Sequence, residues 1–416
     1  MRRAHHLPLL ALAALAPAWL LVNAGPSATP RTAAMRVAGE VSANGEYLIQ
    51  FAPRAAQRSV ATQRLDAEGI QLTTIAANLP ISLATLTPEE AATVANTPGV
   101  VAISPNSEFR ATTTQPTPPW GLDRSDQTDL PLDQRFTYDE SAGAGTTIYV
   151  IDSGINAAHV EFAGRLLPGF VDPALSGGTD DCYGHGTHVA GTAGGTTFGI
   201  AKLATLVPVR VLDCVGEGSA STVVDGIDWV ISDHTSGRAV ANLSFGGPRN
   251  SVVDDAVQAL IADGVAVAVA AGNDGQDACN VTPARVPGAL TVGATTAQDD
   301  RSAFSNVGSC LDLFAPGSNV LSAWKNSAIA TASASGTSMA SPYVAGALAV
   351  LWTGNPGLTA TQVQQLLLVQ ATPNRLSNVG ASSPNLLLHL SPPFRTVSGP
   401  AEAGAPAERC AMSPVC

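Results

Sequence analysis

Basic residues are scarce in this sequence, and lysine most of all. Its 416 residues contain 21 lysines and arginines against 33 aspartates and glutamates, for a formal net charge of −12, and Lys202 and Lys325 are the only lysines. A nucleic-acid partner needs a basic face and an anionic membrane attracts polybasic segments, so the composition argues against both classes of partner. The excess of carboxylates instead favours solubility and offers ligands to a hard cation such as calcium.

Long apolar runs are also missing, apart from one near the N-terminus. Residues 7–22 are mostly apolar, but two prolines interrupt them and they fall short of the roughly 20 residues that a membrane-spanning helix requires. Arg2 and Arg3 precede the run and small residues ending at Ala24 follow it, which is the layout of a secretory signal. Over the alternative of a membrane anchor, we predict a signal peptide, 1–24, and a soluble protein secreted to the extracellular space.

The sequence has no Cys-x-x-Cys pair, which argues against a zinc site. Its six cysteines form an even set in a chain predicted to be exported, and such sets favour disulfides. Their spacing leaves the pairing open. The cysteines are Cys182, Cys214, Cys279, Cys310, Cys410 and Cys416.

The length fits two or three domains, the first of which spans residues 40–110. An alternating strand pattern at 45–51 is followed by a helical pattern at 54–68, a capped helix start at Thr87 and a returning strand at 99–103. This order predicts a small α+β unit. The unit contains no cysteine and no histidine, so we do not expect it to carry the chemistry.

A second, larger unit spans residues 111–395, opening with a Thr- and Pro-rich extended linker at 111–120, and a Gly- and Ala-rich tail follows at 396–416. Short, nearly continuous apolar runs alternate there with helical patterns, which favours an α/β fold with a parallel sheet flanked by helices. The strands expected are 147–151, 206–212, 239–243, 265–271 and 290–292, and the helices 186–195, 220–235, 250–263, 338–353 and 360–370.

The first chemical motif is a carboxylate at the end of a strand. Asp152 follows four apolar or aromatic residues and precedes a Ser-Gly turn. A buried, ionised carboxylate is costly without a partner, so Asp152 is either a functional acid or a turn cap.

The second motif, Gly-His-Gly-Thr-His, places two histidines at the start of a small-residue helix. The pair His185 and His188 lacks the His-Glu-x-x-His arrangement of a zinc peptidase, so a metal site is the weaker interpretation. We interpret His188 as a buried structural residue and His185, between two glycines, as the catalytic candidate.

The third motif sets Ser338 at the N-terminus of a long apolar helix, where backbone amides and the helix dipole favour developing negative charge. A helix-capping serine is the alternative. Asn273 follows the strand expected at 265–271, and its amide could donate to an oxyanion or simply shape a turn.

Together these blocks resemble the subtilisin-like serine peptidases, the subtilases, in which Asp, His and Ser occur in this chain order. The sequence is most similar to the proteinase K branch and, within it, to the aqualysin-like bacterial enzymes. Further similar blocks are Pro-Trp-Gly-Leu-Asp-Arg at 119–124, Val-Leu-Asp-Cys at 211–214, Phe-Ser-Asn at 304–306 and Ser-Pro-Asn-Leu-Leu at 383–387.

The resemblance implies a serine endopeptidase that needs no cofactor for catalysis. Ser338 would be the nucleophile, His185 the general base and acid, Asp152 the residue that orients the imidazole, and Asn273 an oxyanion-hole donor.

The resemblance also implies how a peptide binds. Ser244, Phe245 and Gly246 would form one substrate-binding edge, and the segment Gly216, Glu217 and Gly218 the other, with the peptide held as an extra strand. No charge lines the expected primary pocket, which favours apolar or aromatic side chains before the cut.

The remaining implications concern processing and stability. Residues 40–110 would be an inhibitor-type propeptide that assists folding and is removed by the enzyme itself, which we expect to be monomeric. Disulfides would join Cys182 to Cys214 and Cys279 to Cys310. A structural calcium site would use Asp123, Asp126, Gln127 and Asp133.

Two rival functions belong to other classes. A non-catalytic binding protein of the same fold predicts a damaged set of catalytic residues, whereas all four are present. A metal-dependent hydrolase built on His185 and His188 predicts activity that a chelator removes and that survives Ser338→Ala.

Overall fold

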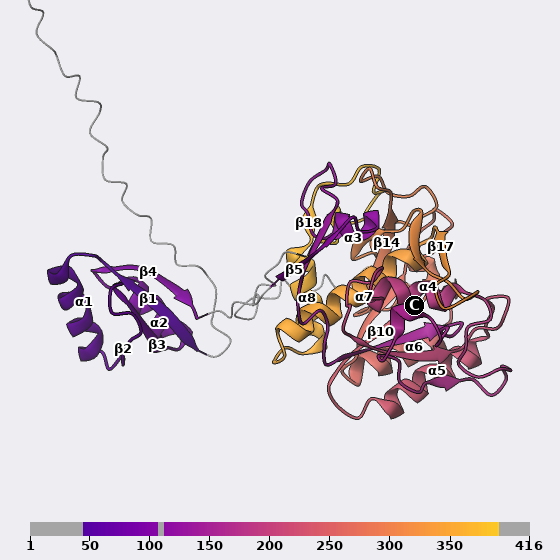
Figure 1. The fold of residues 1–416 in the computed structure, drawn as a ribbon, viewed down its shortest axis with the longest axis horizontal. Helices are drawn as coiled ribbons and strands as arrows, with labels where there is room; N and C mark the ends of the chain where they lie inside the picture. The colour runs from indigo at the N-terminus through magenta and orange to yellow at the C-terminus, as the bar shows by residue number, and fades with distance from the viewer. Residues whose placement is uncertain (1–44, 107–111, 391–416) are drawn as a thin grey trace, which may run out of the picture. The chain divides into compact units, whose positions relative to one another are not determined.

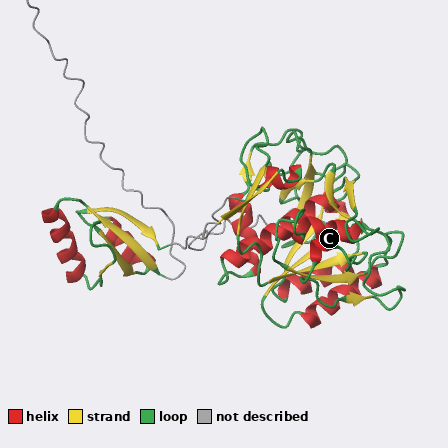
Figure 2. Cartoon of the chain, viewed as in Figure 1, coloured by secondary structure: helices red, strands yellow, loops and turns green. Residues whose placement is uncertain are grey.

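The computed structural model describes residues 45–106 and 112–390. The chain divides into two compact units, Met1–Asn106 and Ser107–Cys416 (Figures 1 and 2). The predicted signal peptide, the boundary predicted between the propeptide and the peptidase unit after residue 110, and the predicted C-terminal tail lie outside the described residues. None of the described helices is both long enough and apolar enough to cross a membrane.

The N-terminal unit is an antiparallel sheet covered by two helices. Its strands lie in the order β2-β3-β1-β4. Alternate residues of the first strand, Tyr47, Ile49 and Phe51, are buried, and they pack in one core with Leu65 and Val94 of the helices. The elements are β1 (Glu46–Phe51), α1 (Ala55–Ala67), β2 (Thr73–Thr74), β3 (Ile81–Thr85), α2 (Pro88–Ala95) and β4 (Val100–Pro105).

The predicted helix start at Thr87 has the expected local chemistry. The Thr87 hydroxyl accepts from the backbone N–H of Glu90, and the Glu90 carboxylate accepts from the N–H of Thr87 at 2.7 Å. This capping box satisfies two N–H groups that a helix start otherwise leaves without partners.

The C-terminal unit is built on a nine-stranded sheet in the order β18-β19-β15-β14-β12-β10-β7-β9-β8, parallel except for the antiparallel pair β18 and β19. The strands are β7 (Thr146–Asp152), β8 (Phe170–Val171), β9 (Thr205–Arg210), β10 (Arg238–Leu243), β12 (Ala266–Ala270), β14 (Leu290–Thr295), β15 (Leu313–Pro316), β18 (Thr372–Pro373) and β19 (Leu386–Leu387). The five strands expected from the sequence are β7, β9, β10, β12 and β14, with shifted ends.

Helices cover both faces of this sheet. Val150 and Ala268 pack on the side of α4, α7 and α8, whereas their chain neighbours Ile151 and Val267 pack on the side of α5 and α6. Burial on both faces explains why the strands are almost wholly apolar. The helices are α3 (Trp120–Ser125), α4 (His185–Gly194), α5 (Ala220–Asp233), α6 (Ser251–Ala262), α7 (Thr337–Gly354) and α8 (Ala360–Gln370).

Short pairs of strands and single turns complete the unit. β11 (Gly247–Pro248) pairs with β13 (Val281–Thr282), and β16 (Val320–Ala323) pairs with β17 (Thr331–Ala334). Two 3-10 turns lie at Val160–Phe162 and Ala278–Asn280.

The linker predicted at 111–120 is wrong for most of its length. Within it, β5 (Thr112–Pro116) pairs in antiparallel fashion with β6 (Arg135–Asp139), and α3 begins at Trp120. The run of threonines suits a strand because β-branched side chains favour extended backbone, and Pro116 stands at its end, where a missing N–H does least harm.

Candidate active site

The order of the central strands positions the site. From β7 the chain passes to β9 on one side and then crosses to β10 on the other side of β7. In parallel sheets such a reversal opens a crevice at the carboxyl ends of the strands. Asp152 is the last residue of β7, and Ser244 directly follows β10. Both therefore lie at that edge.

Asp152 and His185 form a hydrogen-bonded pair. The His185 Nδ1 atom lies 2.8 Å from Asp152 Oδ1 and 3.0 Å from Oδ2, and the side chains are 22% and 0% exposed, respectively. Burial lowers the pKa of His185, but the charge of Asp152, its hydrogen bond and the charge of Asp181 outweigh burial and leave the pKa above its ordinary value. The pair thus fixes the ring with Nδ1 protonated and Nε2 directed away from the carboxylate.

Close packing holds this pair in place. His185 is the first residue of α4, and Gly184 before it has a φ of 111°. A Cβ on Gly186 would lie 2.2 Å from the carbonyl of Gly154 and 3.1 Å from Asp152 Oδ1. Glycine at 186 therefore lets the helix start approach the end of β7.

His188 has a different environment. It is fully buried, and its Nε2 lies 2.9 Å from the carbonyl oxygen of Val320 and 3.2 Å from that of Ala332. Burial is the main cause that lowers its pKa to about 4. An Nε2–H that donates to two carbonyls is not available to a metal, and no group of three His, Cys, Asp or Glu in the described parts of the chain is arranged to hold one.

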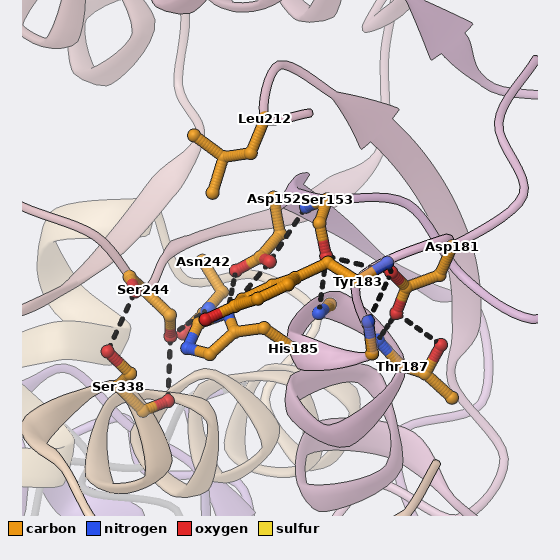
Figure 3. Close-up of polar contacts among 12 residues, drawn as sticks. Asp152, Ser153, Asp181, Tyr183, His185, Thr187, Leu212, Asn242, Ser244 and Ser338 are labelled. Carbon is orange, nitrogen blue, oxygen red and sulfur yellow. Dashed lines mark hydrogen bonds and ion pairs between the residues drawn. The ribbon is translucent and has the colours of Figure 1, made fainter. Parts of the chain in front are cut away.

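Ser338 is the second residue of α7, with Gly336 at the N-cap position and no side-chain cap. Its Oγ donates to the Ser244 carbonyl at 2.8 Å, and Ser244 Oγ donates to the Ser338 carbonyl at 2.9 Å (Figure 3). The capping-serine interpretation is therefore wrong. Among the hydrogen bonds of the described residues there is none from Ser338 to His185, a bond that is often long before substrate binds.

Asn273 lies in the loop after β12 with its amide held in one orientation. Its Oδ1 accepts from Thr337 N at 2.8 Å and Thr337 Oγ1 at 3.0 Å, which leaves Nδ2 as the donor end. A Cβ on Gly336 would lie 3.6 Å from both Asn273 Nδ2 and the Ser338 backbone N. Two N–H donors thus flank one space that only glycine leaves open, which suits an oxyanion.

The two expected substrate-binding segments flank the same region without belonging to any strand. Ser244–Gly246 continues from the end of β10, with Phe245 packed against the core beneath α5 and α6. Gly216, with a φ of 83°, packs so tightly on the Tyr183 ring that a Cβ there would lie 2.6 Å from it. The structure therefore brings this second segment against the loop that leads into α4 and His185.

Four polar residues around the site escaped the sequence analysis: Ser153, Asp181, Arg210 and Asn242. Asn242 Nδ2 donates to Ser244 Oγ at 2.8 Å, and Ser341 Oγ donates to Asn242 Oδ1 at 2.7 Å, which ties the end of β10 to the start of α7. The sequence feature that could have identified Asn242 is its position as a polar residue inside the otherwise apolar run at 239–243.

Both implied disulfides are present, Cys182–Cys214 and Cys279–Cys310. Cys182 lies in the loop before α4, and Cys214 lies in the loop that leads to Gly216. The first bridge thus joins the loop that leads into α4 and His185 to one expected substrate-binding segment. Cys410 and Cys416 lie outside the described residues.

The residues expected to bind calcium lie close together. Asp123 Oδ2 accepts from Gln134 N at 2.9 Å and Asp126 Oδ2 from Thr137 N at 2.7 Å, while Oδ1 of both aspartates is buried without a partner. Burial, with the charges of Asp123 and Asp133, raises the pKa of Asp126 to about 7. Orphaned carboxylate oxygens fit a hard cation.

The fourth expected ligand fits less well. Gln127 Oε1 accepts a hydrogen bond from Asp133 N at 3.1 Å, so this oxygen is already engaged. In residues 45–106 and 112–390, no three acidic, histidine or cysteine side chains converge closely enough to hold a metal ion by themselves.

A buried Asp–His pair, a serine at a helix start and convergent amide donors on a parallel sheet fit a serine hydrolase. The model of the subtilase family matches residues 143–386. An extracellular serine proteinase of Thermus sp. (strain Rt41A) is 52% identical over 301 residues, which cover 72% of this chain and 73% of that protein. The chain belongs to the subtilase family and is a subtilisin-like serine proteinase.

Two further similarities agree. An alkaline serine exoprotease A of Vibrio alginolyticus is 48% identical over 65% of this chain and 50% of its own. The crystal structure of a cold-adapted subtilisin-like serine proteinase shares 48% identity, with a TM-score of 0.63, over 66% of this chain and 98% of that one. The extracellular location predicted from the sequence agrees with the name of the Thermus relative.

Proposed function

We propose that the protein cleaves internal peptide bonds of proteins through an acyl-enzyme formed on Ser338. The observation that carries this proposal is the buried Asp152, bonded to His185 Nδ1 at 2.8 Å, at the sheet edge where Ser338 and Asn273 also lie. Because Asp152 engages Nδ1, Nε2 is the ring nitrogen of His185 that remains to take the proton of the nucleophile.

The mechanism assigns each group one task. Ser338 Oγ attacks the scissile carbonyl carbon while His185 Nε2 takes its proton and later gives that proton to the leaving amine. The carbonyl oxygen becomes an oxyanion and accepts hydrogen bonds from Asn273 Nδ2 and the Ser338 backbone N–H. Water then hydrolyses the acyl-enzyme with His185 again acting as base. Asp152 stays ionised and stabilises the imidazolium formed in each step.

Substrate would bind as an added strand between Ser244–Gly246 and Gly216–Gly218. Both segments lack strand partners in the described part of the chain, which supports this role. We propose a broad specificity that favours apolar or aromatic side chains before the cut. Ala220, where many family members carry a tyrosine, would leave a roomy fourth subsite.

The N-terminal unit would act as an intramolecular inhibitor and folding aid, removed by self-cleavage near 109–112 after a signal peptide, 1–24, has directed export. Its own compact core supports a detachable domain. The mature protein, residues 111–395 with or without the tail 396–416, would act as a monomer.

Calcium would be structural, since no step above requires a metal. Asp123, Asp126 and Asp133, with Gln127, would hold the ion in the loop between α3 and β6, and the two orphaned carboxylate oxygens support this assignment. Such an ion would relieve the repulsion among the three aspartates.

A fluorophosphonate probe tests the proposed nucleophile. We expect covalent labelling at Ser338 in the mature protein, retained in the presence of a chelator, and none in Ser338→Ala. Ser341→Ala, which changes a serine on the same helix, serves as the matched control and should still be labelled. The proposal would be overturned if the mature, folded protein resisted labelling. Activity that survives Ser338→Ala and is lost to the chelator would favour the metal-dependent alternative instead.

A further inference from the structure

The carboxylate of Asp181, in the loop before α4, collects five hydrogen bonds (Figure 3). Oδ1 accepts from Ser153 Oγ at 3.0 Å, Tyr183 N at 3.0 Å and Gly184 N at 2.7 Å. Oδ2 accepts from Thr187 N at 2.8 Å and Thr187 Oγ1 at 2.6 Å. All five partners are donors, an arrangement that fits an ionised carboxylate and leaves no room for an amide in its place.

These bonds cap the helix that carries His185. The N-cap residue of α4 is Gly184, which has no side chain to satisfy the free N–H groups of the first turn. The Asp181 carboxylate takes two N–H groups at the helix start, and Ser153 Oγ takes that of Gly186 at 3.0 Å. The backbone on both sides of His185, at Gly184, Gly186 and Thr187, is therefore held by side chains from outside the helix.

Ser153 also connects Asp181 to the catalytic pair. Its backbone N donates to Asp152 Oδ1 at 2.7 Å, the oxygen that receives His185 Nδ1 at 2.8 Å, while its hydroxyl donates to Asp181. Both carboxylates and the imidazole thus belong to one connected network, visible in Figure 3.

A buried cation fixes the outer part of the same loop. Arg210 is 2% exposed, and its Nη1 donates to the carbonyls of Ser176 at 2.9 Å and Gly178 at 2.8 Å. Its Nη2 lies 3.1 Å from the sulfur of Cys182. Because Arg210 and the disulfide hold the chain on either side of it, Asp181 has little freedom to move away from the donors that it binds.

We propose that Asp181 is a positioning residue for the proteolytic reaction. It holds the first turn of α4 so that the imidazole of His185 faces both Asp152 and Ser338, and its charge stabilises the imidazolium formed when His185 takes the proton of Ser338. This inference rests on the proposed function and adds a second carboxylate to the groups that act on the catalytic histidine.

Few other charges compete for this role. The titratable groups that face His185 are Asp152 from β7, Asp181 and Tyr183 from the loop before α4, and His188 from α4 itself, with the Tyr183 ring 6.4 Å from that of His185. Both carboxylates favour the protonated ring, whereas His188, with a pKa lowered to about 4, stays neutral at working pH. Removal of the Asp181 charge should therefore make the His185 imidazolium less stable.

Asp181→Asn is the direct test, because it keeps the size of the side chain but removes the charge and turns one acceptor into a donor. We expect kcat to fall about 10- to 100-fold with KM little changed, as for a small misplacement of catalytic groups. The acid limb of kcat/KM should move to lower pH, because neutral His185 is the active form and its protonation becomes harder. A purely structural role would lower the yield or stability and leave the acid limb in place.

Asp172→Asn is the matched control. Asp172 is also 2% exposed and caps a turn in the same part of the chain, where Oδ1 accepts from Ala174 N at 2.8 Å, but it has no contact with the catalytic residues. We expect this variant to keep the kcat and the pH profile of the parent. If Asp181→Asn behaves like Asp172→Asn in both respects, the inference is wrong.

Ser153→Ala decides the question if Asp181→Asn fails to fold. It leaves the Asp181 charge and four of its donors but removes the connection to Gly186. We expect a several-fold lower kcat with the acid limb unmoved, and a parental kcat would contradict the inference. Fluorophosphonate labelling of the parent at Ser338 is measured alongside, so that failure of the proposed function itself is recognised separately.

Discussion

The two units of this chain bury different kinds of residue. Among the described residues, the N-terminal unit buries an apolar core in which Ser82 and Thr97 are the only polar residues. The only ionisable side chain buried in that part of the unit is Tyr47. The C-terminal unit buries Asp152, Asp181, His188, Arg124 and Arg210, among others. Burial of a charged group is costly unless it is paired or hydrogen-bonded, so such groups mark where the fold has a task beyond stability.

Because their buried residues differ, the two units should respond differently to amino-acid substitution. In the N-terminal unit a substitution acts through packing and should lower the free energy of unfolding. Around α4 and α7 of the C-terminal unit a substitution acts on a hydrogen-bond network. It should change kcat more than it changes the free energy of unfolding. The predictions below test that separation.

The largest effect is expected from the nucleophile. Ser338→Ala should lower kcat by about 10⁶-fold, a magnitude known for subtilisin of the same family and carried over to this chain. Steady-state hydrolysis of a chromogenic peptide measures it, after added parent enzyme has removed the N-terminal unit that Ser338→Ala cannot remove itself and has then been separated from the variant. Ser82→Ala, the same change at a buried serine of the N-terminal unit, should leave the kcat of the mature enzyme unchanged. A comparable loss of kcat in this variant would contradict the idea that only the C-terminal unit affects rate.

The oxyanion donor comes next. Asn273→Leu removes the Nδ2 donor and should lower kcat by about 10²- to 10³-fold with little change in KM, again the magnitude known for subtilisin. Because Asn273 Oδ1 also accepts from Thr337 N at 2.8 Å, Asn273→Asp is the companion variant: it keeps that acceptor without the donor. Equal kcat losses in the two variants would assign the effect to the donor, whereas a parental kcat in Asn273→Asp would refute the assignment.

Strands were the most predictable part of the fold, for a physical reason. β10 and β12 are buried on both faces, so they appear in the sequence as short apolar runs that few other elements produce. β5 was mistaken for a linker because its exposed threonines show no burial pattern, and its strand character depends on pairing with Arg135–Asp139 far along the chain.

The site was predictable where its chemistry lies in short motifs and not where it depends on a loop. Nothing in the sequence distinguishes Asp181 from the adjacent Asp180, because five donors are brought to Asp181 only by the path of the loop between β8 and α4. Likewise, Ser338 was interpretable as a cap until the structure placed Gly336 at the cap position.

The third prediction concerns the packing of the N-terminal unit. Leu65 on α1 is fully buried, so Leu65→Ala should destabilise that unit by about 2–5 kcal/mol. Val60→Ala on the same helix, where the side chain is 49% exposed, should cost less than about 0.5 kcal/mol. Thermal unfolding of the full chain in a Ser338→Ala background, which prevents self-cleavage, measures both.

The proposed propeptide role sharpens this test. In an active background Leu65→Ala should reduce the yield of mature enzyme but leave the kcat of the enzyme that does mature unchanged. A loss of stability in both units at once would show that they unfold as one body and would weaken the case for a detachable domain.

The smallest effect, and one confined to acid, is expected at His188. Its folded-state pKa is about 4 against an ordinary value of 6.5, so between these pH values the unfolded chain binds a proton that the folded protein does not. The stability contributed by neutral His188 is therefore fully present above about pH 6.5 and declines as pH falls toward 4. His188→Gln keeps an N–H donor for the carbonyls of Val320 and Ala332 but cannot titrate. Urea unfolding from pH 8 to pH 4, again in the Ser338→Ala background, should show a shallower loss of stability in the variant than in the parent, even if the variant starts lower. Parallel curves would mean that the titration of His188 does not control the loss of stability at acid pH.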